Sequence, residues 1–116
     1  MRKTLRLLQN SKIVKKYETL DVKLGKDFYY VKIRADIKNN TKLYRREYMC
    51  IGDEKYSYHW QGKDGTLITR WDNAPHQKVK TFPHHKHLSD GTVVESYEIV
   101  LEKILKSIET KIGVKP

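Results

Sequence analysis

The sequence has few of the features that mark secreted or membrane proteins. A single cysteine, Cys50, excludes a disulfide or a paired-cysteine zinc site within one chain. No apolar run approaches the length of a transmembrane helix, and the first one stops at Leu8, which is too short for a signal peptide. We therefore predict a soluble cytoplasmic protein with no role for a membrane.

Acidic side chains are also scarce relative to basic ones. The chain carries 24 Lys and Arg residues against 14 Asp and Glu, a formal net charge of +10. Residues 1–50 hold 14 of the basic and 5 of the acidic side chains, so the electropositive surface should come mainly from this half. This excess favours a polyanionic partner, above all nucleic acid, and general solubility is the alternative explanation.

The 116 residues nevertheless include enough aromatic and aliphatic side chains for the core of one domain, residues 1–116. Alternation of apolar and polar residues predicts five strands, preceded by a short helix at residues 3–10. The predicted strands span residues 17–24, 28–37, 43–51, 55–60 and 66–72. Short turn sequences between them predict an antiparallel meander.

The first two hairpins decide which side chains share a face of this sheet. A two-residue turn at residues 25–26 predicts that Leu20 lies opposite Val31 and, by the same count, Val22 opposite Tyr29. The loop around Asn39 and Asn40 allows two registers. A two-residue loop would place on the apolar side Tyr44, Arg46 and Tyr48. A three-residue loop would place there instead Leu43, Arg45 and Glu47.

The last third of the chain predicts an irregular segment and then a helix. Residues 73–94 lack a clear period, and we expect a long surface segment with at most one short strand, at 79–82. An amphipathic helix should follow over residues 95–112, capped by Thr92 and Glu95, or by Ser96. Its apolar stripe would consist of Tyr97, Leu101, Ile104 and Ile108. Packed on one face of the sheet, this helix gives an α+β fold.

Four of the five histidines lie between residues 76 and 87. Cleavage of RNA without a metal needs a base, an acid and a cation for the phosphate, and histidine, arginine and lysine provide these groups. We assign proton transfer to His76, His84 and His87, with Asp72 to orient them. Phosphate binding falls to Arg70 and Lys86. Further catalytic candidates are His59 and His85. This interpretation needs no cofactor.

Two other interpretations of the cluster stay open. A metal ion would take ligands from His59, Asp72, His76, His84, His85 and His87. If residues 84–87 are extended, His85 and His87 share a face and can chelate, whereas His84 points away. Alternatively the side chains are structural, because Asp72 and Asn73 before a proline are ordinary turn residues.

Nucleic-acid contacts are expected from basic and aromatic side chains outside the histidine cluster. The candidates are Lys32, Arg34, Arg45, Arg46, Tyr58, Lys78 and Lys80. Tyr58 belongs to the row Tyr56, Tyr58 and Trp60 on one face of a strand. Such a row either stacks on bases or forms core under a helix, and the core is the more common arrangement.

The stretch YSYHW…DGTLITRWDNAPH…FPHHKH, residues 56–87, resembles the TumE-type toxins of type II toxin–antitoxin systems. The family pattern is matched at Tyr56, Tyr58, His59, Trp60, Asp64, Gly65, Arg70, Trp71, Asp72, Asn73, Ala74, Pro75, His76, Phe82, Pro83, His84, His85 and His87. Where the family often has a second histidine after DNAPH, this chain has Gln77. That position is therefore not expected to be essential.

The resemblance implies a toxin with a cognate antitoxin, usually a small DNA-binding protein. Ribonuclease action is common among type II toxins, which agrees with the basic charge and the His, Arg and Lys set. We therefore predict a toxin that binds and cleaves cellular RNA, with the oligomeric state open. The alternatives are a non-catalytic nucleic-acid-binding protein and a metal-dependent nuclease or phosphate-transferring enzyme. On the leading interpretation, His84→Ala should relieve growth arrest without unfolding the protein.

Overall fold

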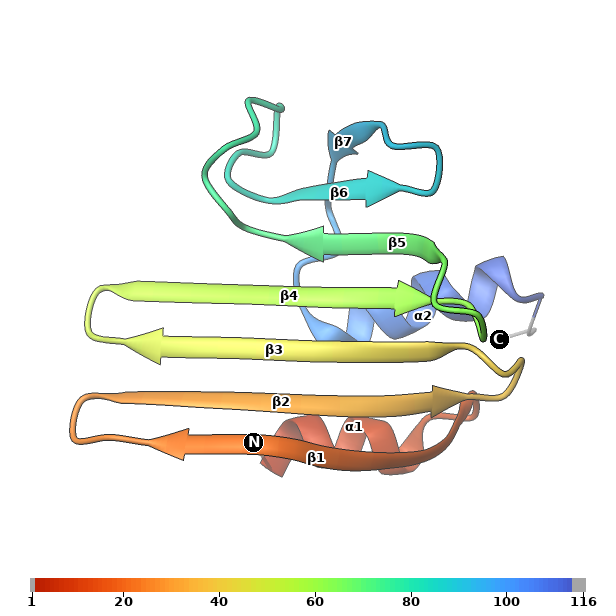
Figure 1. Ribbon diagram of the computed structural model, residues 1–116, viewed down its shortest axis with the longest axis horizontal. Helices are drawn as coiled ribbons and strands as arrows, with labels where there is room; N and C mark the ends of the chain where they lie inside the picture. Colours follow the sequence, from red (N-terminus) through yellow and green to blue (C-terminus); the bar gives the residue numbers. More distant parts are fainter. Residues whose placement is uncertain (1, 114–116) are drawn as a thin grey trace.

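Every strand of the sheet pairs with the strand that follows it in the chain. The computed structural model describes residues 2–113, and its seven strands form one antiparallel sheet in the order β1-β2-β3-β4-β5-β6-β7 (Figure 1). The elements are α1 (Arg2–Asn10), β1 (Val14–Leu24), β2 (Phe28–Ile37), β3 (Lys42–Cys50), β4 (Asp53–Gln61), β5 (Leu67–Asp72), β6 (His85–Leu88), β7 (Val93–Glu95) and α2 (Leu101–Lys111). The predicted α+β class and antiparallel meander are confirmed.

The predicted number of five strands is wrong, because β6 and β7 lie inside the segment expected to be irregular. The strand expected at residues 79–82 is absent. Instead, Phe82 N donates to Val79 O at 3.0 Å and His84 N donates to Thr81 O at 2.9 Å, which makes two successive turns. The sequence does not predict β6, because its four residues, HKHL, show no alternation of apolar and polar side chains.

The first hairpin has a register two residues away from the predicted one. Val22 lies opposite Val31, not opposite Tyr29, and a bulge between Thr19 and Asp21 shifts the preceding pairs. The turn is therefore centred on Lys26 and Asp27, one residue later than predicted, and is closed by a bond from Gly25 N to Phe28 O of 2.9 Å. This turn places Val22 and Val31 directly opposite each other, so both lie on one face of the sheet, and the bulge changes only the register of the pairs before Asp21.

The second hairpin adopts the three-residue register that the sequence left open. Ala35 lies opposite Leu43 and Ile33 opposite Arg45, so the loop consists of residues 38–40. Asn40 has a φ of 67°, a left-handed conformation that asparagine tolerates better than most residues. As a result, the side chains of Leu43, Arg45 and Glu47 share the face of the apolar residues of β2.

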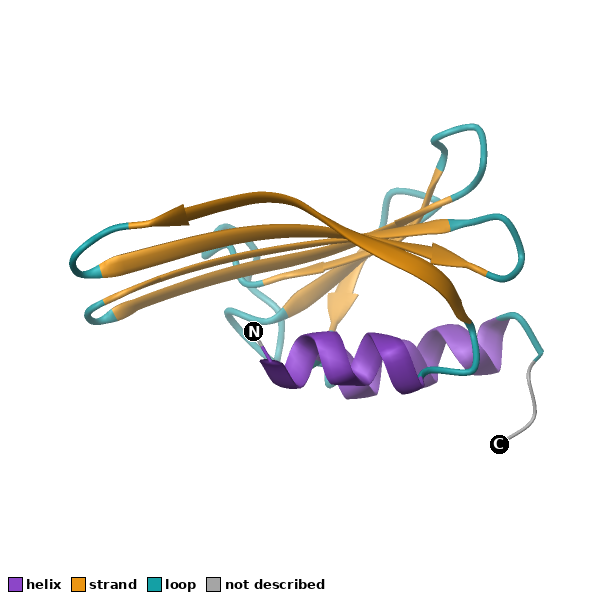
Figure 2. Cartoon of the chain, turned by 90° about the horizontal axis from the view of Figure 1, so that it is seen from below, coloured by secondary structure: helices purple, strands orange, loops and turns teal. Residues whose placement is uncertain are grey.

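Both helices lie on one face of the sheet, here called the helix face, and leave the other, the open face, uncovered (Figure 2). The core between helices and sheet includes Leu43, Tyr58, Trp60, Trp71 and Ile104. The aromatic row of β4 is thus core, and Tyr58 is only 3% exposed. Tyr58 therefore does not meet the requirement for stacking on a base, and its predicted role in nucleic-acid binding is wrong.

The C-terminal helix begins at Leu101, six residues later than predicted. Its N-cap is Val100, which makes no side-chain capping bond, so the predicted caps at Thr92, Glu95 or Ser96 are wrong. Ser96 is instead engaged with the β5–β6 segment, since its backbone N donates to Thr81 Oγ1 at 2.9 Å. Tyr97 is 63% exposed and does not belong to the apolar stripe, which comprises Leu101, Ile104, Leu105 and Ile108.

Candidate functional site

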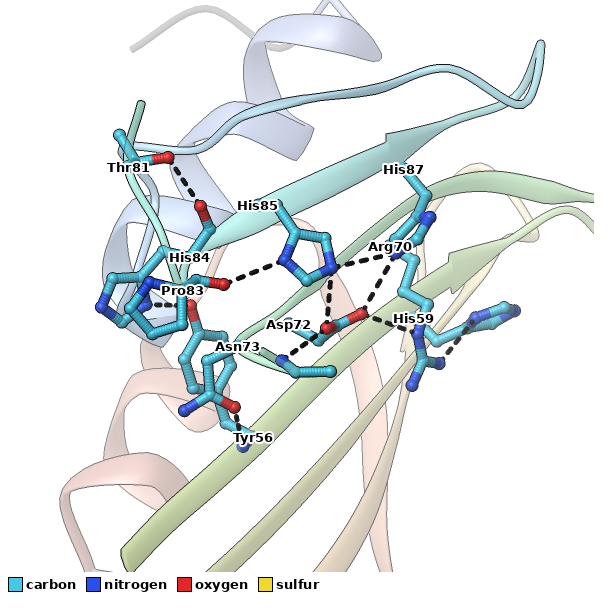
Figure 3. Close-up of polar contacts among 11 residues, drawn as sticks. Tyr56, His59, Arg70, Asp72, Asn73, Thr81, Pro83, His84, His85 and His87 are labelled. Carbon is cyan, nitrogen blue, oxygen red and sulfur yellow. Dashed lines mark hydrogen bonds and ion pairs between the residues drawn. The ribbon is translucent and has the colours of Figure 1, made fainter. Parts of the chain in front are cut away.

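The antiparallel register aligns polar side chains across β4, β5 and β6 on the open face. One row contains Ser57, Asp72 and His85, and the next row contains His59, Arg70 and His87. Residues two apart in a strand point to the same face, so these six side chains form one patch. Figure 3 shows that Arg70, Asp72, His85 and His87 converge, with His59 beyond Arg70.

Asp72 is the centre of this patch. Its Oδ1 lies 2.9 Å from His85 Nε2 and accepts a 2.9 Å bond from the backbone N of Ala74. Its Oδ2 lies 3.2 Å from Arg70 Nε and 3.4 Å from His87 Nε2. The carboxylate side chain is only 8% exposed, and the bonds from Ala74 N and Arg70 Nε compensate for part of the water that it has lost.

His85 is held in place from both sides of its ring. His85 is only 1% exposed, and its Nδ1 lies 2.9 Å from the carbonyl oxygen of Pro83. The peptide bond before Pro83 is cis. Because a carbonyl oxygen only accepts, Nδ1 carries a proton, and Nε2 faces Asp72 and His87.

His59 is linked to the patch through Arg70, whose Nη1 lies 3.3 Å from His59 Nδ1. Guanidinium groups only donate, so Nδ1 accepts and the proton of the neutral ring is on Nε2. Burial lowers the pKa of His59, and the positive charges of Arg70 and Arg46 lower it further. His59 therefore presents a neutral N–H donor and is unsuited to accept a proton at Nε2.

The lowered pKa of His59 predicts a pH-dependent loss of stability. The unfolded chain binds a proton at His59 near its ordinary pKa of 6.5, whereas the folded chain does so only at lower pH. Unfolding is therefore favoured as the pH falls below 6.5, with no further change below the folded-state pKa. We expect His59→Gln to remove this part of the loss in urea unfolding curves recorded between pH 8 and 5. If the free energy of unfolding fell by the same amount with pH in both proteins, His59 would not be the source of the loss.

The turn after β5 supports the structural interpretation of part of the motif. Asp72 bonds the backbone of Ala74, as turn-forming Asx residues do. Asn73 accepts from Tyr56 N at 3.0 Å and donates to Glu54 O at 2.8 Å, which fixes the segment to the start of β4. Asn73 was not among the predicted site residues, although it lies within the matched motif.

Two predicted catalytic residues lie away from the patch. His84 Nδ1 is 2.8 Å from the hydroxyl of Tyr56, a core residue, so its ring points away from Asp72. Lys86 alternates with His85 and His87 and points to the helix face, where its Nζ lies 3.2 Å from Glu98. These contacts contradict a shared site with His87, because successive residues of a strand point to opposite faces. His76 is exposed in the loop after β5.

The predicted nucleic-acid contacts are also divided between the two faces. Lys32, Arg34 and Arg46 are in register with the patch on the open face. Arg34 is paired with Glu18 and Asp36, whereas Arg46 is exposed. Arg45 lies on the helix face, bonded to Glu47 and Tyr58, so its predicted contact with a nucleic-acid backbone is wrong. Lys78 and Lys80 are exposed in the β5–β6 loop.

Two hollows flank the patch on the open face. A smaller one, of about 380 Å³, is lined by residues that include Lys32, Tyr44, Arg46, His59 and Arg70. A larger one, of about 640 Å³, lies between β3, β4 and the β5–β6 loop, and Arg70, Asp72 and His76 line it. Tyr44 is not among the site residues predicted from sequence. The face of the sheet on which it lies depends on the register of the hairpin at residues 38–40, which the sequence left open.

A comparison with protein-family models matches residues 4–112 to the family described as Toxin TumE. The chain belongs to the TumE toxin family. This confirms the resemblance inferred from residues 56–87 and extends it over nearly the whole chain. Searches of curated proteins and of solved structures find no significant match. Membership of a toxin family implies an antitoxin partner, and neither described helix is long and apolar enough to span a membrane.

Proposed function

We propose that this TumE-family toxin cleaves RNA in the cytoplasm, and that the reaction takes place at the open-face patch. The observation that carries the proposal is the convergence of Arg70, Asp72, His85 and His87 beside a basic hollow. A buried carboxylate that orients two imidazoles, next to a half-exposed guanidinium, is suited to chemistry at a phosphate.

The hollow lined by Lys32, Arg46 and Arg70 binds the RNA backbone. These cations lie on β2, β3 and β5 and belong to the face of the sheet that no helix covers. Tyr44 and His59 line the same hollow and provide an aromatic ring and an N–H donor. Phosphate contacts of this kind give an affinity that falls steeply with salt and depends little on sequence.

In the reaction, the ribose 2′-oxygen attacks the adjacent phosphorus and the bond from phosphorus to the 5′-oxygen breaks. His87 accepts the proton of the 2′-hydroxyl, and the leaving 5′-oxygen takes a proton from solvent. The products are a 2′,3′-cyclic phosphate and a 5′-hydroxyl. Arg70 stabilises the charge on the phosphate oxygens. His87, the more exposed ring of the pair, touches the substrate, and His85 acts as a positioning residue because it is buried.

The antitoxin inhibits the toxin by covering the open face with acidic or apolar surface. The basic character of Lys32, Arg46 and Arg70 favours an acidic partner. A small DNA-binding antitoxin is the form that the family resemblance suggests.

Purified toxin incubated with matched RNA and DNA oligonucleotides tests the proposal. We expect cleavage of RNA alone, since DNA lacks the 2′-hydroxyl, and cyclic-phosphate ends on the product. His87→Ala should lower the rate about 100-fold or more, whereas His84→Ala, its matched control from the same segment, should change it little. Binding without cleavage would overturn the proposal in favour of a non-catalytic nucleic-acid-binding toxin. Equal losses in both variants would overturn the assignment of the patch.

A further inference from the structure

Three electron-pair donors meet at one point of the open-face patch. His85 Nδ1 donates to Pro83 O, so Nε2 is the ring nitrogen that faces Asp72 and is free to bind a metal ion. His87 Nε2 lies 3.1 Å from His85 Nε2, and the Asp72 carboxylate lies within 3.4 Å of both rings. Imidazole nitrogens and carboxylate oxygens are common metal ligands, and here they lie close together.

We propose that Asp72, His85 and His87 bind a divalent transition-metal ion such as zinc or manganese. The candidate ligand atoms of these residues all lie within 4.8 Å of one another. Ligand atoms at about 2.0–2.2 Å from a tetrahedral zinc ion are roughly 3.3 Å apart. The two Nε2 atoms are 3.1 Å apart, His85 Nε2 lies 2.9 Å from Asp72 Oδ1, and His87 Nε2 lies 3.4 Å from the other carboxylate oxygen, Oδ2. Two imidazoles and one carboxylate form a ligand set that leaves further coordination positions open.

The surrounding groups orient this ligand set as they do in metal sites. Pro83 O fixes the tautomer and rotation of His85, and backbone carbonyls commonly do this for metal-binding histidines. Arg70 Nε and Ala74 N bond the two oxygens of Asp72 and fix the carboxylate plane. The geometry also reduces the six metal candidates of the sequence to three. His84 bonds Tyr56, His59 bonds Arg70, and the exposed His76 is not part of the group.

The open coordination positions face the substrate. Asp72 and His85 are buried, whereas the side chains of His87 and Arg70 are 30% and 38% exposed, so the metal is reached from the open face. A phosphate oxygen that binds the metal would also lie near Arg70, and the two cations would together stabilise the negative charge of the transition state. With the metal bound, His87 Nε2 is a ligand, and the metal replaces it as the group that contacts the phosphate. This catalytic role rests on the proposed function, but metal binding itself does not.

Metal binding is measured directly on the full chain, first stripped with EDTA and then dialysed against Zn²⁺, Mn²⁺ or Mg²⁺. We expect one bound Zn²⁺ or Mn²⁺ per chain and weak binding of Mg²⁺, which prefers oxygen ligands. Cobalt(II) added in place of zinc should show the absorption bands of a site with nitrogen ligands. Binding should weaken at least about 100-fold in His87→Ala and stay unchanged in His84→Ala, with circular dichroism to confirm that both fold.

The outcomes separate the metal site from the ribonuclease function. Stoichiometric binding that depends on His87 but not on His84 supports the site, whether or not RNA is cleaved. Absence of stoichiometric binding, or equal binding by the two variants, overturns it. RNA cleavage that persists in EDTA would leave the proposed function standing with proton transfer by the histidines alone. Metal binding without any cleavage would instead leave the site standing and remove the proposed function.

Discussion

Replacing Asp72 by alanine should cost about 3–5 kcal/mol of folding free energy, the range for removing one partner of a buried charged network. The carboxylate accepts from Arg70 and Ala74 and contacts both His85 and His87. Without it, the buried ring of His85 loses its partner and the turn after β5 loses the bond that closes it. Urea unfolding at neutral pH in EDTA measures this loss without any contribution from metal binding.

Asp64→Ala provides the matched control for this variant. Asp64 also accepts a turn bond, from Thr66 N at 3.0 Å, but it is exposed and lies in the β4–β5 turn. Its replacement should cost at most about 1 kcal/mol, as expected for a surface residue that closes a turn. If Asp72→Ala were no more destabilising than Asp64→Ala, the carboxylate would not organise the patch.

Arg70→Ala should have the largest effect on activity without a comparable effect on stability. Removal of a group that stabilises developing charge typically lowers the rate about 100- to 1,000-fold. The guanidinium is 38% exposed, so the loss of its ion pair with Asp72 should cost no more than about 1 kcal/mol. Cleavage rates of the labelled RNA, together with growth of cells that express each variant at equal levels, measure the effect.

Arg6→Ala removes the same charge from an exposed position of α1 and is the control for general electrostatics. It should weaken RNA binding slightly and leave the rate of the bound complex unchanged. Arg70→Lys should restore only part of the rate, because lysine is a point charge without the planar donor fork of arginine. Growth arrest that persists in Arg70→Ala would exclude a role of this side chain in the toxic reaction.

The strands that could be predicted from sequence are those whose side chains alternate. In β2, Val31, Ile33 and Ala35 are buried and the residues between them are not, so strand and facing both follow from the pattern. Strand β6 lacks this signal, because one of its two residues on the helix face is Lys86, which forms an ion pair with Glu98, and only Leu88 is apolar. The start of α2 was misplaced for another reason, because the backbone of Ser96 binds Thr81 and not a first helical turn.

The sequence predicts which residue types make up the candidate site, but not which of these side chains contact each other. Arg70 and Asp72 share a face by strand parity, and His85 and His87 do so if residues 84–87 are extended. What the sequence did not determine was the register between β5 and β6, because the intervening loop contains two turns and no short hairpin signal. Because the sequence does not predict β6, it also does not show that His84 and Lys86 point away from His87, and all three residues enter the predicted catalytic set together.

The sequential order of the strands also has a consequence for synthesis of the toxin on the ribosome. Strands β2 and β3, which carry Lys32 and Arg46, can pair as soon as they emerge, because each contacts only its neighbours in the chain. His85 and His87 join Asp72 only when β6 folds onto β5, and α2 completes the core later still. In this order of pairing, the nascent chain exposes its basic face before Asp72, His85 and His87 come together. An antitoxin that recognises that face could bind during this interval and keep the newly made toxin harmless.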